Sequence, residues 1–396
     1  MQRVFEMNWN DPKLRLSLKQ LQETFQLQGR DSRIVRAAFA YSRWKKSLAF
    51  RLPLFKKTEK NARLKVLFVL AGGVGDMVCA KFLTDRYLDL LPNADIDVFA
   101  SVPEAARMLL GTEERIKFLS RNNFSIRNYD LAVYICLTVK FLRVNRIALK
   151  EQAPQFIPIL DKAQTAQKEL GCLLDDPYLT EGILGKWLCE QGGNRFDFLS
   201  YLGGIAVQTP SRKIKTTGYS LEHWGLEGKK YITFHDGMSE VQLRGAFRPT
   251  RAWPPKRWIE FLEEFKKVYP DILCVQLGGK NSPVYSQADM CLVGKTRWQD
   301  IPVLLENSLL HVDTESGLVH LAALIGTRSV VLFGPSEAKF LGYTGNKNIS
   351  SKKCGGCMWI LSDWMNRCAL GEEVPPCMED ISAADVLRAV EELLNR

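Results

Sequence analysis

One pattern limits the fold of this chain more than any other: short apolar runs are each followed by a turn and a helical pattern. Residues 65–71 form the first run and lead into a turn at 72–76 and a helix that ends near residue 91. Further strands are expected at 97–100 and 129–135. Continuous apolar runs of this length are typical of parallel strands buried on both faces. The pattern therefore predicts an α/β fold.

The same alternation returns in the second half of the chain. Strands are expected at 231–234, 273–277, 309–312 and 329–333, with helices at 256–268 and 318–325. Two such blocks predict two Rossmann-like, doubly wound domains that face a cleft, because these sheets bind ligands beyond the carboxyl ends of their strands. We expect the domains at 63–205 and 229–380, a linker at 206–228, and a last helix within 381–396 that Ser382 and Asp385 cap.

Residues 1–62 are predicted to be a basic helical appendage. Residues 1–65 hold sixteen Lys or Arg and five Asp or Glu, a net charge of +11, whereas the whole chain carries +10. Residues 31–52 have the pattern of an amphipathic helix with a basic face, which suits an anionic membrane surface. Packing on the body and contact within an oligomer are the alternatives. No zinc-finger, RRM-like or basic-zipper pattern favours nucleic acid as a partner.

The apolar content also predicts where the protein works. The longest uncharged stretch, residues 198–211, has fourteen residues, whereas a membrane-spanning helix needs about 20. The first thirty residues lack the apolar core of a signal peptide. We therefore expect a cytoplasmic protein, peripheral at the inner membrane if the basic helix binds there, with cysteines reduced unless they hold a metal.

The turn after the first strand contains Gly72, Gly73 and Gly75, followed by Asp76. Glycines allow a tight turn and the close approach of a ligand, but the third glycine of the dinucleotide fingerprint is lacking, which disfavours NAD. The dipole of the following helix stabilises a carboxylate in its first turn by about 0.3–1 kcal/mol. Asp76 is therefore either a plain helix-terminal acid or a general base facing the cleft.

A second turn joins a strand to a helix in the other domain. Its polar residues are Asp313, Thr314, Glu315, Ser316 and Gly317, and His320 follows one turn into the helix. The free N–H groups of a helix start suit a pyrophosphate, and hydroxyls can add donors. Singly, each residue is a helix cap. Together with the Phe-Gly-Pro-Ser turn at 333–336, the string indicates a diphosphate site.

The late cysteines have the spacing of a metal site within residues 354–377. Cys354, Cys357, Cys368 and Cys377 form the pattern C-x2-C-x10-C-x8-C. Four thiolates suit a tetrahedral ion, iron or zinc, and four protein ligands leave no open position, so the predicted metal is structural. Four reduced cysteines without a metal are the alternative.

These segments of residues 63–396 resemble the heptosyltransferase family of bacterial GT-B glycosyltransferases, glycosyltransferase family 9. The family's glycine turn with Asp matches 73–76, its Asp-Ser/Thr-Gly-x-x-His-Leu-Ala segment matches 315–322, and its Phe-Gly-Pro-Ser/Thr turn matches 333–336. Glu315 replaces the usual Asp, with Asp313 two residues upstream, and Arg251 replaces the Lys of the family's Lys-x-Trp-Pro.

The resemblance implies inverting transfer of a sugar, usually heptose from ADP-heptose, to a bacterial glycan such as the lipopolysaccharide core. Asp76 would accept the proton of the acceptor hydroxyl, and no divalent metal would be required for catalysis. The residues implied to hold the donor are Thr250, Arg251, Lys256, Lys295, Asp313, Thr314, Glu315, Ser316, Gly317 and His320.

Two alternatives follow from the same segments. The late cysteines and the Asp-Thr-Glu-Ser-Gly string at 313–317 are similar to the autotransporter heptosyltransferase branch, where such cysteines hold iron and the acceptors are protein serines. The replacements at Arg251 and Glu315 suggest instead a nucleotide-sugar-binding module without turnover.

Overall fold

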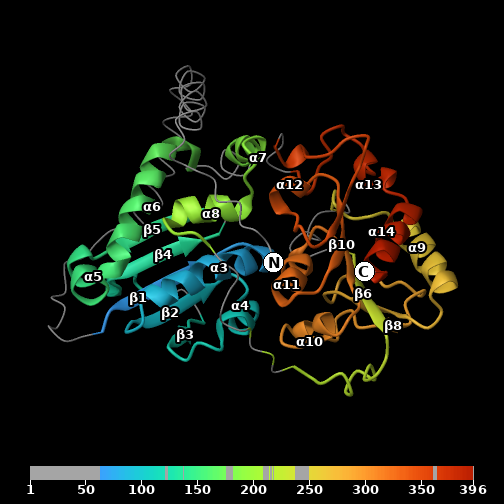
Figure 1. Cartoon of the computed structure of the whole chain (residues 1–396), viewed down its shortest axis with the longest axis horizontal. Helices are drawn as coiled ribbons and strands as arrows, with labels where there is room; N and C mark the ends of the chain where they lie inside the picture. The colour runs from blue at the N-terminus through green and yellow to red at the C-terminus, as the bar shows by residue number, and fades with distance from the viewer. Residues whose placement is uncertain are drawn as a thin grey trace.

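The structure is a computed structural model that describes residues 63–120, 124–136, 138–174, 182–207, 214, 216, 218–236, 249–359 and 364–395. The predicted basic appendage, residues 1–62, lies outside the described residues, as does part of the predicted linker. Two α/β lobes lie side by side, the first coloured blue to green and the second yellow to red (Figure 1). No helix within the described ranges is long and apolar enough to cross a bilayer.

The first lobe is built on a five-stranded sheet in the order β3-β2-β1-β4-β5. Its strands are β1 (Lys65–Leu70), β2 (Asp95–Ala100), β3 (Ile116–Phe118), β4 (Leu131–Ile135) and the antiparallel β5 (Val139–Val144). Its helices are α3 (Val74–Leu90), α4 (Pro103–Leu110), α5 (Arg146–Gln152), α6 (Ile157–Leu170), α7 (Gly185–Glu190) and α8 (Arg195–Gly203). The expected strands and the first helix are confirmed.

The second lobe has a six-stranded parallel sheet in the order β11-β10-β9-β6-β7-β8. Its strands are β6 (Tyr231–His235), β7 (Leu273–Leu277), β8 (Met290–Cys291), β9 (His311–Thr314), β10 (Ser329–Phe333) and β11 (Lys347–Ser350). Its helices are α9 (Pro255–Val268), α10 (Ile301–Glu306), α11 (Gly317–Ile325), α12 (Ala338–Leu341), α13 (Pro376–Asp380) and α14 (Ala383–Leu394). Counted within the lobe, the strand order is that of the Rossmann fold.

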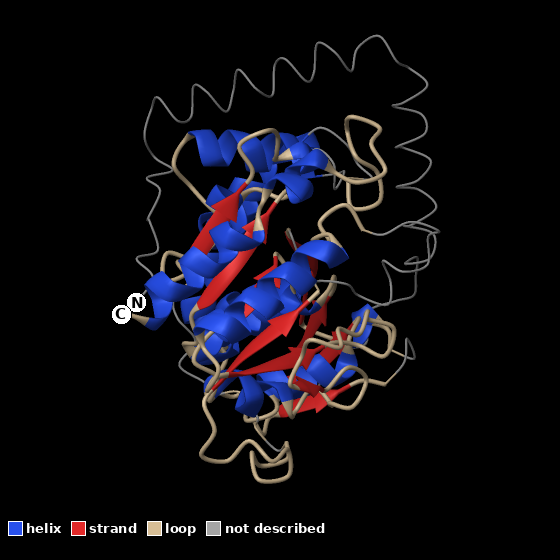
Figure 2. Cartoon of the chain, turned by 90° about the vertical axis from the view of Figure 1, so that its right-hand side faces the viewer, coloured by secondary structure: helices blue, strands red, loops and turns tan. Residues whose placement is uncertain are grey.

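Helices pack against both sheets, as the view turned by 90° shows (Figure 2). In the second lobe, Trp253, Trp258, Phe261 and Phe265 form a fully buried aromatic layer with the strands. Each indole N–H keeps an acceptor: Trp253 donates to the carbonyl of Ile381 and Trp258 to the Asp236 carboxylate, both at 2.9 Å. The predicted capping box of the last helix is present, since the Ser382 hydroxyl accepts the N–H of Asp385.

One expected strand is shifted by two residues. The apolar run at 309–312 predicted its bounds, but β9 runs from His311 to Thr314 and Leu309 is exposed. Asp313 lies within the strand with its carboxylate fully buried, and His235 and His311 both contact it. A paired charge can therefore lie inside the strand.

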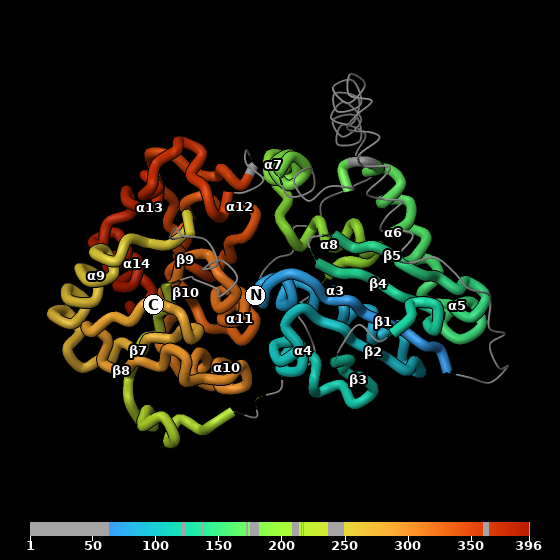
Figure 3. The backbone as a smooth tube through the Cα atoms, turned by 180° about the vertical axis from the view of Figure 1, so that it is seen from behind, coloured from blue at the N-terminus to red at the C-terminus, as the bar shows by residue number. Residues whose placement is uncertain are grey.

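The contacts between the lobes include two pairs of helices. Helices α3 and α11 pack directly against each other at the centre of the molecule, and α7 packs against α12 (Figure 3). Helix α3 follows β1, where the strand order of the first sheet reverses, and α11 follows β9, where that of the second sheet reverses. These are the positions at which open α/β sheets bind ligands.

Candidate active site

The first turns of α3 and α11 meet through two glycines. A Cβ added at Gly75 would lie 2.6 Å from Cδ2 of His320, and one at Gly317 would lie 3.0 Å from Cβ of Val74. Side chains at either position would push the helices apart. Gly75 and Gly317 therefore allow contact between the two lobes. The roles predicted from the sequence, close approach of a ligand at Gly75 and donor binding at Gly317, stay predictions.

Asp76 lies in the first turn of α3 with both carboxylate oxygens engaged. Its Oδ2 accepts the backbone N–H of Gly73 at 2.7 Å, and its Oδ1 pairs with the guanidinium of Arg195 on α8. The neighbouring Gly72 has φ +88°, and a Cβ there would lie 2.2 Å from Oδ2 of Asp76. The side chain remains 22% exposed. Asp76 is thus a helix-terminal acid that also remains accessible at the junction of the lobes.

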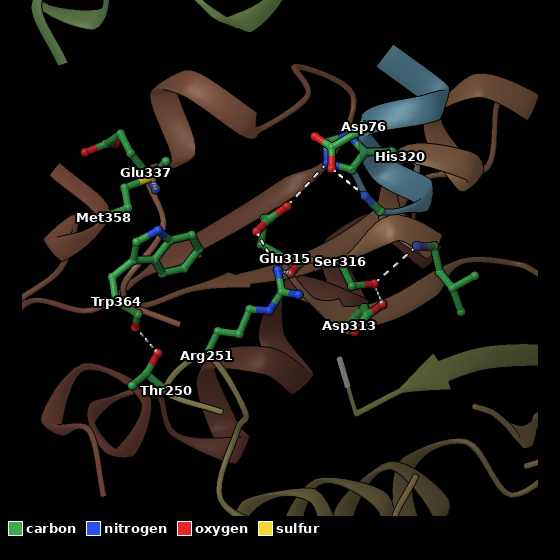
Figure 4. Close-up of polar contacts among 12 residues, drawn as sticks. Asp76, Thr250, Arg251, Asp313, Glu315, Ser316, His320, Glu337, Met358 and Trp364 are labelled. Carbon is green, nitrogen blue, oxygen red and sulfur yellow. Dashed lines mark hydrogen bonds and ion pairs between the residues drawn. The ribbon is translucent and has the colours of Figure 1, made fainter. Parts of the chain in front are cut away.

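Charged side chains gather around the start of α11, opposite Asp76 (Figure 4). Arg251 donates to the backbone carbonyl of Glu315 at 2.9 Å and to its carboxylate at 3.2 Å. Nε2 of His320 lies 3.3 Å from the other Glu315 oxygen, and Nδ1 lies 2.8 Å from the hydroxyl of Tyr343. The thiol of Cys79 on α3 is 3.9 Å from the same Nδ1. The contact of Cys79 with His320 joins the two lobes.

The electrostatics of this cluster favour ionised groups. Burial opposes the charge of His320, but Cys79 and Glu315 raise the pKa of its imidazole to about 9. Burial would also raise the pKa of Glu315, yet the hydrogen bond from His320 and the charges of Arg251 and Arg195 lower it overall. At neutral pH the start of α11 therefore carries two kinds of cation, imidazolium and guanidinium, around one carboxylate.

The two acids near the family's Asp position, Asp313 and Glu315, have different surroundings. Asp313 is fully buried and accepts the hydroxyl of Ser316, with ring nitrogens of His235 and His311 at 3.1 and 3.2 Å. Burial raises the pKa of Asp313, but the neighbouring histidines lower it overall. Glu315 lies with Arg251 in the cluster. Asp313 thus supports the turn from beneath, and Glu315 faces the site.

The hydroxyls of this turn are partly engaged. Ser316 caps α11 by accepting the N–H of Leu318 at 3.2 Å. The hydroxyls of Thr314 and Ser336 are buried, and neither has a hydrogen-bond partner among the residues that the structure describes. A buried polar group without a partner costs free energy, so these two hydroxyls suit a ligand that would bind them.

Three predicted donor residues lie elsewhere. The Thr250 hydroxyl donates to the carbonyl of Trp364 at 2.5 Å (Figure 4). Lys256 pairs with Glu379 at 2.6 Å, and Lys295 donates to the carbonyl of Cys291 at 2.8 Å. Thr250 therefore fixes the backbone next to Arg251, whereas the structure does not bring the ammonium groups of Lys256 and Lys295 to the cluster.

Sequence reasoning missed Arg195, Cys79 and Tyr343. Arg195 begins α8, where Asn194 and Asp197 form a capping box that the sequence could have revealed. Its partner Asp76 is 119 residues away. No local pattern reveals such a contact, and Cys79 and Tyr343 read as ordinary core residues.

The cysteine segment is only partly assembled. The thiol of Cys377 contacts that of Cys354, and burial together with the charges of Cys354 and Cys357 raises the pKa of Cys377 to about 12. Burial and Cys368 likewise raise the pKa of Cys357. No group of three or more Cys, His, Asp or Glu in the described part is arranged to hold a metal. The predicted four-cysteine site is thus not formed here, although thiols that repel one another as thiolates suit a cation.

The segment that contains the start of α11 is similar to a known protein family. Residues 277–358 match the model of glycosyltransferase family 9 (heptosyltransferase). The match confirms the resemblance to heptosyltransferases. The matched segment runs from the end of β7 into the cysteine segment and contains Glu315, Ser316 and His320. The chain matches no curated protein sequence.

Two solved structures of TibC share the fold of this chain. The iron-containing dodecameric glycosyltransferase TibC from enterotoxigenic E. coli H10407 is 16% identical, with a TM-score of 0.57 over 87% of this chain and 82% of that one. TibC in complex with ADP-D-β-D-heptose has 15% identity and a TM-score of 0.57, covering 84% and 76%. E. coli ADP-heptose LPS heptosyltransferase II has 16% identity and a TM-score of 0.47, covering 84% and 99%. The expected GT-B arrangement of two Rossmann-like domains is confirmed.

Proposed function

We propose that this protein is an inverting heptosyltransferase that moves a heptose from ADP-heptose to an acceptor hydroxyl. The observation that carries the proposal is the meeting of Asp76 with the cation-lined start of α11. Displacement at a sugar carbon needs a base on the acceptor side and a stabiliser of the leaving group on the donor side. TibC, which shares the fold, binds ADP-D-β-D-heptose.

Each lobe would supply one part of the reaction: the first lobe the base, and the second lobe the site that holds the leaving group. The acceptor oxygen attacks the anomeric carbon while Asp76 accepts the hydroxyl proton, and a new C–O bond forms. The bond between the anomeric carbon and the diphosphate breaks, and its electron pair leaves on the ADP oxygen. Because one displacement occurs, the configuration at that carbon inverts.

The leaving ADP carries the charge that the donor lobe must stabilise. The N–H groups of the first turn of α11, the guanidinium of Arg251 and the imidazolium of His320 supply positive charge around it. Arg251 can form a bidentate pair with two phosphate oxygens. It would exchange its contact with the Glu315 carboxylate for the diphosphate.

The acceptor is either a bacterial glycan, such as the lipopolysaccharide core, or serine hydroxyls of an autotransporter. The late cysteines and the string at 313–317, which resemble the autotransporter branch, favour the protein acceptor. Incubation with ADP-D-β-D-heptose and each acceptor separately, followed by mass spectrometry and NMR of the anomeric proton, tests both. Transfer with inversion supports the proposal. Binding of ADP without transfer to either acceptor would leave a nucleotide-sugar-binding module.

The nucleotide is tested by thermal shift with ADP, UDP and GDP. A ligand at 100 times its dissociation constant adds about 2.7 kcal/mol of stability. Stabilisation by ADP alone supports ADP-heptose. Stabilisation by UDP or GDP alone would replace the donor, and no shift with any nucleotide would contradict the donor site.

We further propose that Cys354, Cys357, Cys368 and Cys377 hold a structural iron or zinc ion. The support is the contact between the thiols of Cys354 and Cys377, and the iron of TibC. The segment also adjoins the donor side: the N–H of Gly356 donates to the carbonyl of Gly334 at 3.1 Å. Metal analysis of the purified protein, with Cys354→Ser as the variant and Cys274→Ser as the control, tests the assignment. Equal metal content in all three proteins would contradict it.

We also propose a cytoplasmic location, with residues 1–62 contacting either an anionic inner membrane or a second copy of the chain. Each basic residue near an anionic surface contributes about 1 kcal/mol. Flotation with anionic vesicles, set against the sedimentation mass of the protein, separates the two partners. Absence from the vesicles would refute the membrane contact.

A further inference from the structure

We propose that Arg195 is a positioning residue for the base, a role that rests on the function proposed for Asp76. Arg195 is the first residue of α8, and its guanidinium pairs with Oδ1 of Asp76 across the first lobe. It touches the base and not the reacting atoms. Its effect is to fix how the carboxylate of Asp76 faces the acceptor hydroxyl.

The start of α8 is held firmly, so it can aim a long side chain. The side chain of Asn194 accepts the N–H groups of Phe196 and Asp197, and the Asp197 carboxylate accepts the N–H of Asn194 at 2.9 Å. The ring of Phe196 packs on Phe82 of α3, with centroids 4.8 Å apart. The backbone from which Arg195 departs is thereby fixed to the helix that carries Asp76.

The environment of Arg195 favours a maintained contact. The side chain is only 7% exposed, so neither salt nor solvent screens the pair as at a surface. Glu315, the acid of the donor lobe, also feels the charge of Arg195. A guanidinium this buried is hard to displace, because breaking its pair with the Asp76 carboxylate is costly.

Two donors define the orientation of the base. The N–H of Gly73 holds Oδ2 of Asp76 at 2.7 Å, and Arg195 holds Oδ1. With both in place the carboxylate plane cannot rotate, and each oxygen retains a further lone pair for the acceptor. Without Arg195 only the backbone contact remains, and the carboxylate can turn about its terminal torsion, which is intrinsically broad.

The test separates positioning from binding and from folding. We expect Arg195→Ala to lower kcat about 10- to 100-fold, as a misplaced reacting group does. The KM for ADP-D-β-D-heptose and the thermal shift with ADP should stay within about twofold of wild type, because the loss of an interaction made only in the transition state lowers kcat and leaves substrate binding unchanged. The rate is followed as ADP release with both acceptors present. Guanidinium ion at low, non-denaturing concentration should restore part of the rate.

Either of two results would overturn the inference: an unchanged kcat, whether or not KM rises, or no rescue by guanidinium. Arg146→Ala is the matched control, since Arg146 pairs with Asp161 at 2.6 Å on the surface. If Arg195→Ala does not fold, Arg195→Gln keeps a hydrogen-bond donor on a shorter, uncharged side chain and is judged by kcat and KM alone. Asp76→Ala separates the two proposals: its full activity refutes the base itself, whereas its inactivity beside an active Arg195→Ala refutes only the positioning role.

Discussion

The contact between the lobes makes a sharp prediction for Gly75→Ala. The new Cβ would lie 2.6 Å from Cδ2 of His320, whereas carbon atoms pack at about 3.5–4.0 Å. His320 cannot turn aside freely, because Tyr343 and Glu315 hold its two ring nitrogens at 2.8 and 3.3 Å. The helices must therefore separate by about 1 Å.

The cost follows from two opposing effects. Overpacking costs about 1–3 kcal/mol, and alanine is favoured over glycine in a helix by up to about 1 kcal/mol. We expect a net loss of about 1–2 kcal/mol. For domains of this size each kcal/mol lowers the Tm by about 2–4 °C. Since Asp76 is the next residue, a 1 Å displacement should also lower the transfer rate about 100-fold.

The assay compares Gly75→Ala with Gly345→Ala by differential scanning fluorimetry and by ADP release. Gly345 is the matched control, because a Cβ there meets nothing within 4 Å. We expect Gly345→Ala to match wild type in both measurements. If Gly75→Ala also matched wild type in Tm and rate, the direct contact between α3 and α11 would be refuted.

Three further predictions concern single side chains. The pKa of His320 is raised to about 9, so the charge of its imidazolium stabilises the fold fully below the unfolded pKa of about 6.5 and less as the pH rises through 9. Between these two pH values the Tm of the wild type should fall more steeply than the Tm of His320→Gln. Parallel curves of Tm against pH would contradict this. Ser382→Ala removes the cap of α14 and should lower stability by about 1 kcal/mol, which an unchanged Tm would disprove. Arg251→Lys loses the planar fork and should weaken ADP binding about tenfold or more, the equivalent of one charge-assisted hydrogen bond, measured by isothermal titration; equal affinity would remove Arg251 from the donor site.

The elements were predictable where the pattern is local. The run at 65–71, the helix after it and the cap at Ser382 all depend on neighbouring residues, and the structure has them within one or two positions. β9 was misplaced because the burial of Asp313 depends on His235, which belongs to a different strand. Local patterns carry no information about such partners.

The site was predictable only in part for the same reason. Asp76 and the turn at 313–317 each follow a strand, and parallel strands bring such turns to one edge of a sheet. That the two turns belong to adjoining sites depends on how the lobes pack. A basic residue close to a motif in sequence can pair elsewhere, as Lys256 and Lys295 do. A basic residue far from the motif can instead contact the candidate base, as Arg195 contacts Asp76.

The glycine contact between α3 and α11 also governs how this protein could be recombined. One hydrophobic core runs through both lobes, so a hybrid that joins the first lobe of this chain to the second lobe of another protein of the same fold must reproduce the contact between them. Here the surfaces that must fit are defined by the absence of side chains at Gly75 and Gly317. A hybrid whose new lobe brings a larger residue to either position would fail at this joint, however well its linker is chosen. Glycine at both of these positions is therefore the first criterion for choosing the two proteins that a hybrid combines.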